Sequence, residues 1–154
     1  MIATAIAVAL HILGAVVWVG GMFAIYMCLR PALGTLDPPP RFRLMRVTFA
    51  KFFPWVWGAI LLLLGSGYWM VFMTFGGMAG VRLYVHLMQG IGWLMIVLFV
   101  WLFHGPWLRF ERAVDAEDWP NAGPNLNRIR QIISVNLPLG LLVVVIGASG
   151  RYWG

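Results

Sequence analysis

Residues 83–103 read LYVHLMQGIGWLMIVLFVWLF, an apolar stretch in which His86 and Gln89 are the strongly polar side chains. A helix of about 20 apolar residues spans the hydrocarbon core of a bilayer. The stretch is continuous rather than alternating, which favours a helix over a barrel strand. This stretch predicts a helix at about residues 82–113. Three more apolar stretches predict helices at about residues 2–29, 52–75 and 131–150.

The composition places the whole chain in a membrane. Of its 154 residues, 62% are hydrophobic and 10% are charged, whereas soluble domains average about 45–50% apolar and about 25% charged residues. We therefore expect a single transmembrane domain of residues 1–154, surrounded by the lipid bilayer. Short connections make sequential helices antiparallel, so the predicted fold is an all-α, four-helix bundle with up-down-up-down connectivity.

The basic residues are distributed unevenly. The net charge is +6, and nine of the eleven basic residues flank the first and third connections, while Arg82 and Arg151 fall on the other side. This is the positive-inside pattern, and it predicts that both termini lie on the outer, periplasmic side and the two long connections in the cytoplasm. The charge excess is thus a topology signal, and no nucleic-acid partner is expected. All five acidic residues also fall in the predicted cytoplasmic segments, which argues against a proton-coupled transporter.

Prolines mark the predicted ends of the helices. The segment from Gly34 to Pro40 contains three consecutive prolines, which lack an N–H donor and fix φ, so we expect a loop there. Pro54 is expected near the start of the second helix, where a missing N–H costs little. Pro120 and Pro124 are expected in the turn before the last helix.

The sequence repeats itself around two histidines. At an offset of 75 residues, His11, Trp18 and Pro31 recur as His86, Trp93 and Pro106. A second set recurs at an offset of 84 residues: Arg46, Pro54, Tyr68 and Trp69 as Arg130, Pro138, Tyr152 and Trp153. The chain is therefore predicted to form two pseudo-repeated helix–loop–helix units, with the two histidines facing each other across a pseudo-two-fold axis.

The paired histidines suggest a haem site. A histidine within a membrane span is costly unless it faces the bundle interior and has a partner, and paired imidazoles are suitable axial ligands for haem iron. Small residues one turn inward would make room for a porphyrin, and indoles two turns inward would pack against its edge. The predicted haem b site consists of His11, His86, Gly14, Gly90, Trp18 and Trp93. It would serve electron transfer with quinol or a periplasmic redox partner, and the protein is then a possible membrane oxidoreductase.

Two alternatives remain open at this stage. Met78 and Met88, with His11 and His86, could form a copper site for binding or uptake, because soft thioethers select Cu(I). Alternatively, the histidines only hydrogen-bond across helices in a structural membrane subunit, and the glycines only allow close helix packing. With either kind of site, the chain could form a homo-oligomer. His104 lies at the cytoplasmic end without a repeat partner, and its role stays open.

Several segments resemble known families. LHILGAVVWVGGM at residues 10–22 and LRPAL at 29–33 resemble the opening helix of the copper-resistance D (CopD)-like membrane proteins, and VHLMQ at 85–89 and GASGRYW at 147–153 look like small bacterial members. The four-helix pattern is also similar to the HemJ haem-binding membrane proteins, although Met88 stands where that family has a lysine. The resemblance implies a bacterial inner membrane and a connection with a metal or haem.

Overall fold

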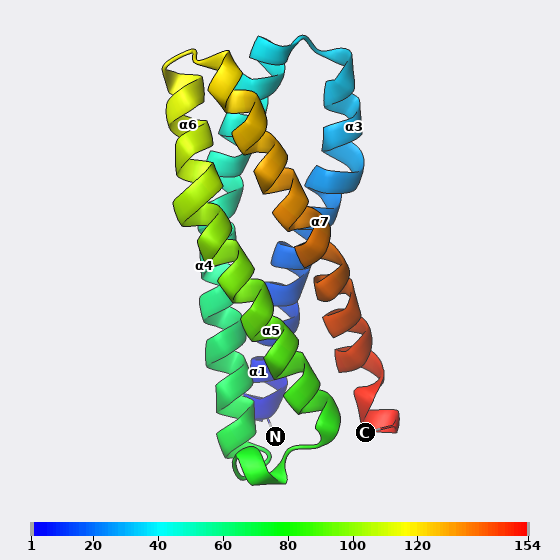
Figure 1. The fold of residues 1–154 in the computed structure, drawn as a ribbon. Helices are drawn as coiled ribbons and strands as arrows, with labels where there is room; N and C mark the ends of the chain where they lie inside the picture. The colour runs from blue at the N-terminus through cyan, green and yellow to red at the C-terminus, as the bar shows by residue number, and fades with distance from the viewer. Residues whose placement is uncertain (1, 154) are drawn as a thin grey trace.

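The computed structural model describes residues 2–153, which form four long helical rods joined by short connections (Figure 1). The first rod comprises α1 (Ile2–Ala15), η1 (Val16–Gly20), α2 (Gly21–Phe23), η2 (Ala24–Leu29), α3 (Arg30–Ala32) and η3 (Leu33–Thr35). The second is α4 (Pro38–Met73), followed by η4 (Met78–Gly80) in the connection. The third comprises α5 (Leu83–Leu102), η5 (Phe103–Trp107) and α6 (Leu108–Asp115), and the fourth α7 (Trp119–Ser149) with η6 (Gly150–Tyr152).

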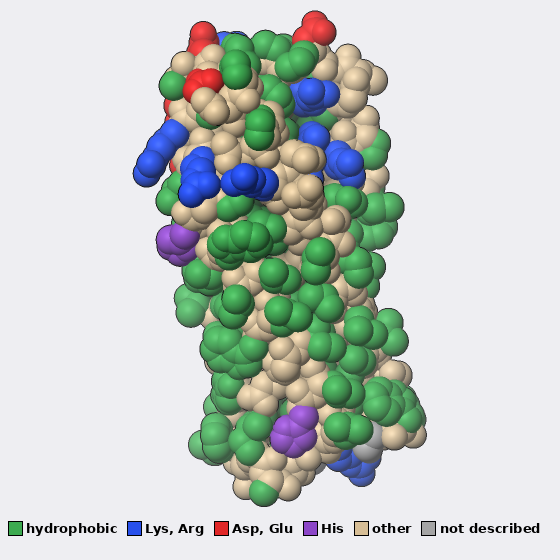
Figure 2. Space-filling model, in the orientation of Figure 1, with side chains coloured by type: hydrophobic (Ala, Val, Ile, Leu, Met, Phe, Trp, Pro, Cys, Tyr) green, Lys and Arg blue, Asp and Glu red, His purple; other side chains and the backbone are tan. Residues whose placement is uncertain are grey.

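The rods confirm the predicted all-α, four-helix architecture. Each has 33 to 36 residues and is apolar enough to cross a membrane. Consecutive rods are antiparallel, so both termini lie at the same end of the bundle (Figure 1). The middle of the molecule presents apolar side chains on its surface, while acidic and most basic side chains gather at the opposite end from the termini (Figure 2). The chain is a multi-pass membrane protein in contact with lipid.

The packing follows the predicted helix–loop–helix units. The most extensive helix contacts join α1 to α4 and α5 to α7. Between the two units, aromatic rings fill the half of the bundle nearer the charged end. Phe53 lies edge-on to Trp107 and Phe99, with ring centroids 5.1 and 5.6 Å apart. Such ring pairs add stability beyond the burial of their apolar area.

Two helices start earlier than predicted. The second begins at Pro38 rather than near residue 52, and the fourth at Trp119 rather than near residue 131. The expectation of a non-helical proline segment was wrong, because Pro38 to Pro40 form the first turn of α4, where backbone N–H groups have no intrahelical partner in any case. Pro54 consequently lies inside α4 rather than at its start, a position that membrane helices tolerate.

The repeat-related prolines distort the first and third rods in a similar way. Pro106 lies within the π-helical η5, and Pro31 follows directly after the π-helical η2 and Arg30. A proline cannot donate to the carbonyl four residues earlier, and its ring crowds that carbonyl. The wider π-helical turn relieves this crowding while the rod continues. Each half thus has a π-helical segment close to its repeat-related proline, although the two segments do not coincide at the 75-residue offset.

Candidate functional site

The His11 ring makes a hydrogen bond to a side chain of another helix. Its Nδ1 atom lies 3.0 Å from Oγ of Ser66 on α4. The Ser66 hydroxyl also donates to the Leu62 carbonyl oxygen at 2.5 Å. Because a hydroxyl carries one proton, Ser66 accepts from Nδ1–H of His11. In the neutral imidazole, the ring lone pair then lies on Nε2.

The helix α4 is shaped to receive this imidazole. Ser66 is 7% exposed, one of two buried polar side chains in the described part of the chain. A Cβ atom on the next residue, Gly67, would lie 3.2 Å from Cε1 of His11. The ring therefore packs directly on the backbone of α4. Sequence reasoning missed this contribution, although the small polar triplet GSG at residues 65–67 interrupts a leucine run and signals it.

A second polar contact joins α4 to α5 near the same end of the bundle. The Tyr68 hydroxyl accepts hydrogen bonds from Nε2 of Gln89 at 2.9 Å and from Nε1 of Trp93 at 3.1 Å. Tyr68 lies two residues beyond Ser66, on another side of α4. Polar side chains of α1 and α5 thus both bond to α4 at this depth, and Trp93 has a hydrogen-bond partner rather than a porphyrin edge.

The structure places His86 differently from His11. His86 is exposed on the surface of α5, whereas Met88 is half-buried against α7, with its Cε atom 3.0 Å from where a Cβ atom of Gly147 would lie. Residues two apart on a helix do not face each other. His86 and Met88 therefore point to different sides of α5 and are not placed by this helix alone to bind the same metal ion. Met78 lies exposed in η4, at the same end of the bundle.

The remaining residues of the predicted haem site also differ between the two halves. Gly14 is buried, and a Cβ atom there would lie 3.2 Å from the Ala59 carbonyl oxygen, so this glycine allows α1 to approach α4. Gly90 is exposed and faces open space. Trp18 is 3% exposed and lies edge-on to Phe99, while Trp93 is 44% exposed. These surroundings give no support to a porphyrin held between two matching helix faces.

His104 lies at the charged end. Its Nδ1 atom is 3.0 Å from the carbonyl oxygen of Val100, one turn earlier in the same rod, and its ring is exposed beside Trp57 and Phe103. Within residues 2–153, no three His, Cys, Asp or Glu side chains gather into a group that could hold a metal ion.

Comparison with known proteins bears on the haem and copper hypotheses through the family of the chain. The family model of copper resistance protein D matches residues 46–149. The chain belongs to the CopD family. Neither a curated protein nor a solved structure matches it. Membership connects this CopD-family protein to copper and supports the copper alternative rather than haem. The matched part includes Ser66, His86 and Met88, while His11 lies before it.

The charged end of the CopD-family bundle carries two different kinds of arginine. Arg46 bonds Asp115 at 2.9 Å and lies 3.2 Å from Glu111, and Arg43 pairs with Glu117. These ion pairs join α4 to α6 and the turn that follows it. In contrast, a group of arginines between the first, second and fourth rods lines a cavity without a carboxylate. This cavity, the basic pocket, is formed by Arg30, Pro31, Gly34, Arg41 and Arg130.

Proposed function

We propose that this CopD-family protein binds copper ions within the membrane, at the end of the bundle opposite the charged connections, with Nε2 of His11 as an inward ligand. The observation that carries the proposal is the hydrogen bond from Nδ1–H of His11 to Ser66. Histidines that ligate metals almost always donate their other ring N–H in this way, which fixes the tautomer and the ring orientation. The family match, with its connection to copper, supports the same metal.

Methionines supply suitable further donors at this end. Met70 is four residues after Ser66, so it lies on the same face of α4, one turn nearer the end of the helix. Met78, Met88 and the imidazole of His86 belong to the same end of the bundle. Thioether and imidazole donors together suit Cu(I). We propose that His11 and Met70 form the inner part of the site and that the other donors capture the ion.

The direction of entry follows from the charge distribution. The positive-inside rule assigns the end with nine basic residues to the cytoplasm. His11 and both termini then lie towards the periplasmic side of a bacterial inner membrane. Copper reaching His11 would come from that side, which is the arrangement expected for binding or uptake. The proposal involves no quinol, redox partner or second copy of the chain.

A Cu(I) titration of the purified protein in detergent tests this proposal. Under reducing conditions, the protein competes for Cu(I) with a chromophoric chelator, and we expect a stoichiometric high-affinity site. His11→Ala should lose this site. His104→Ala is the matched control, because it also removes an imidazole whose Nδ1 has an internal partner, and it should bind Cu(I) as the wild type does. Equal affinity of the two variants, or a Soret band in the purified protein, would overturn the proposal.

A further inference from the structure

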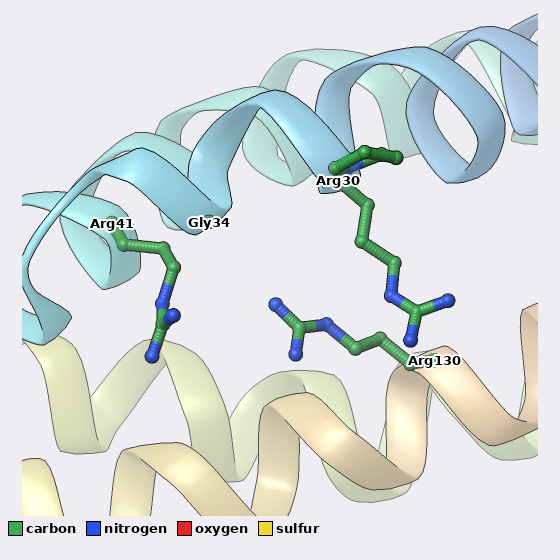
Figure 3. A pocket seen from close by; sticks show the side chains of 5 residues that line it. Arg30, Gly34, Arg41 and Arg130 are labelled. Carbon is green, nitrogen blue, oxygen red and sulfur yellow. The ribbon is translucent and has the colours of Figure 1, made fainter.

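The basic pocket brings three guanidinium groups together from three helical segments. Arg30 comes from α3, Arg41 from the second turn of α4 and Arg130 from α7, and all three side chains extend into the space between these helices (Figure 3). The cavity that they line with Pro31 and Gly34 has a volume of about 370 Å³. Like charges in one cavity repel each other. The folded chain therefore holds an arrangement that is unfavourable without a counter-charge.

The residues that line the pocket do not supply this counter-charge, and Asp37, which directly precedes α4, is not among them. No acidic residue lines the pocket, and within residues 2–153 the carboxylates that form ion pairs do so with Arg43 and Arg46. Asp118 caps the start of α7. The Nε atoms of Arg41 and Arg130 are buried without a hydrogen-bond partner, as is that of Arg46, but the Arg46 guanidinium has carboxylate partners at its other nitrogens. Buried donors of this kind normally have a partner, and a donor attached to a charged group gains most from an anionic one.

The internal repeat shows where the counter-charge is missing. Arg46 and Arg130 are equivalent at the 84-residue offset, near the charged ends of the second and fourth rods. Arg46 contacts Glu111 and Asp115 on the third rod. At the 75-residue offset, these two carboxylates correspond to Leu36 and Pro40 on the first half of the chain. The equivalent of an ion-paired arginine has thus lost both of its acidic partners and has gained Arg30 and Arg41 as neighbours.

We propose that the basic pocket binds one phosphate-bearing anion, which replaces the carboxylates absent from this half of the repeat. Guanidinium groups offer planar forks of N–H donors that match phosphate oxygens in bidentate pairs. The pocket lies at the end of the apolar belt, where the headgroup of an anionic phospholipid would sit, and basic pockets between membrane helices bind such headgroups. A free phosphate ion has the same recognition chemistry, and the experiment separates the two sources.

The test measures thermal unfolding and binding of the full-length protein in a non-ionic detergent. Three probes are used: short-chain phosphatidylglycerol, phosphatidylcholine with the same chains, and inorganic phosphate. A ligand that binds the folded state raises the unfolding temperature by mass action. We expect phosphatidylglycerol to raise it and phosphatidylcholine to leave it unchanged. If inorganic phosphate raises it equally, the site takes the free ion, whereas an effect of phosphatidylglycerol alone identifies the lipid. If neither phosphatidylglycerol nor inorganic phosphate raises the unfolding temperature, the proposal is overturned.

Variants separate the pocket from general basicity. Arg41→Gln and Arg130→Gln should each weaken phosphatidylglycerol binding by about tenfold or more, as expected for the loss of charge-assisted hydrogen bonds. Arg128→Gln is the matched control, because Arg128 is exposed on the same helix and outside the pocket. Without probes, Arg130→Gln should unfold at no lower temperature than the wild type, since it removes a repulsion. An equal loss of binding in Arg128→Gln would show non-specific attraction and refute the pocket.

Discussion

Nδ1 of His11 lies 3.0 Å from Oγ of Ser66, and this hydrogen bond joins α1 to α4 within the apolar part of the bundle. Both groups would be costly to leave unpaired there. The bond therefore pairs the half-buried imidazole with the buried Ser66 hydroxyl and also orients the ring. Because the Ser66 hydroxyl proton is directed at the Leu62 carbonyl, the bond leaves one defined nitrogen, Nε2, for a ligand.

Replacement of the serine tests the orienting role. Ser66→Ala removes the acceptor of Nδ1–H, so the ring can rotate or change tautomer. Loss of such an outer partner typically weakens metal binding by about 10–100-fold, and we expect a change of that size in the Cu(I) competition assay. Ser134→Ala is the control, because the Ser134 hydroxyl bonds the Gln131 carbonyl of its own helix. Unchanged Cu(I) affinity in Ser66→Ala would mean that the hydrogen bond serves packing alone.

Gly67 provides a steric test of the same site. A Cβ atom there would lie 3.2 Å from Cε1 of His11, so Gly67→Ala should displace the imidazole by a few tenths of an ångström and weaken Cu(I) binding. Gly65→Ala adds the same methyl group on the same helix, where no atom lies within 4 Å. That control should bind copper normally and gain about 0.5–1 kcal/mol from helix propensity. Similar copper affinities in the two variants would contradict the proposed position of the ring.

Gly140 tests the packing between the two halves of the bundle. A Cβ atom on this α7 residue would lie 2.9 Å from Cγ2 of Val19 and 3.1 Å from Cε of Met95. Val19 is short and branched, so the helices must separate slightly, and overpacking of this kind costs about 1–3 kcal/mol. Gly140→Ala should therefore lower the unfolding temperature in detergent. Gly92→Ala, which meets nothing within 4 Å, should not lower it.

The ion pairs of Arg46 should contribute a salt-dependent part of the stability. Arg46→Gln removes the contacts with Glu111 and Asp115, and for such partly exposed pairs we expect a loss of about 1 kcal/mol or less. The difference from the wild type should shrink as salt screens the pairs. Chemical unfolding at low and high ionic strength measures this. A loss that is independent of salt would instead point to the packing of the arginine stem.

The membrane orientation is tested with reporter fusions. Nine of eleven basic residues lie at one end of the bundle, and the positive-inside rule places that end in the cytoplasm. At a site between Leu36 and Asp37, in the turn before α4, a reporter enzyme that functions only in the cytoplasm should be active, and one that functions only in the periplasm should be inactive. At the C-terminus, the reporter enzyme that functions only in the periplasm should be active, and the one that functions only in the cytoplasm should be inactive. The reverse pattern would place His11 towards the cytoplasm and exclude periplasmic entry of copper.

The membrane architecture could be predicted from the sequence because apolar runs of this length have one stable solution in lipid. The start of α4 could not be predicted, since prolines occur both in loops and in the first turn of a helix. The site was harder to predict. His11 and His86 are equivalent in the repeat, yet His11 faces Ser66 and His86 is exposed, because the rotation of each helix depends on its packing partners. Spacing along the chain does not specify that rotation.

All Asp and Glu side chains lie at one end of the described bundle, and this has a consequence for the oxidation state of copper bound at the other end. At the other end, the donors of the site that we propose around His11 are imidazole and thioether groups, all of them neutral. An ion held there keeps its full charge in a medium of low polarisability. The Born cost of transfer from water grows with the square of the charge, so a doubly charged ion is penalised about four times as strongly as a singly charged one. The site we propose therefore selects the reduced ion by electrostatics alone, in addition to the preference of sulfur for it.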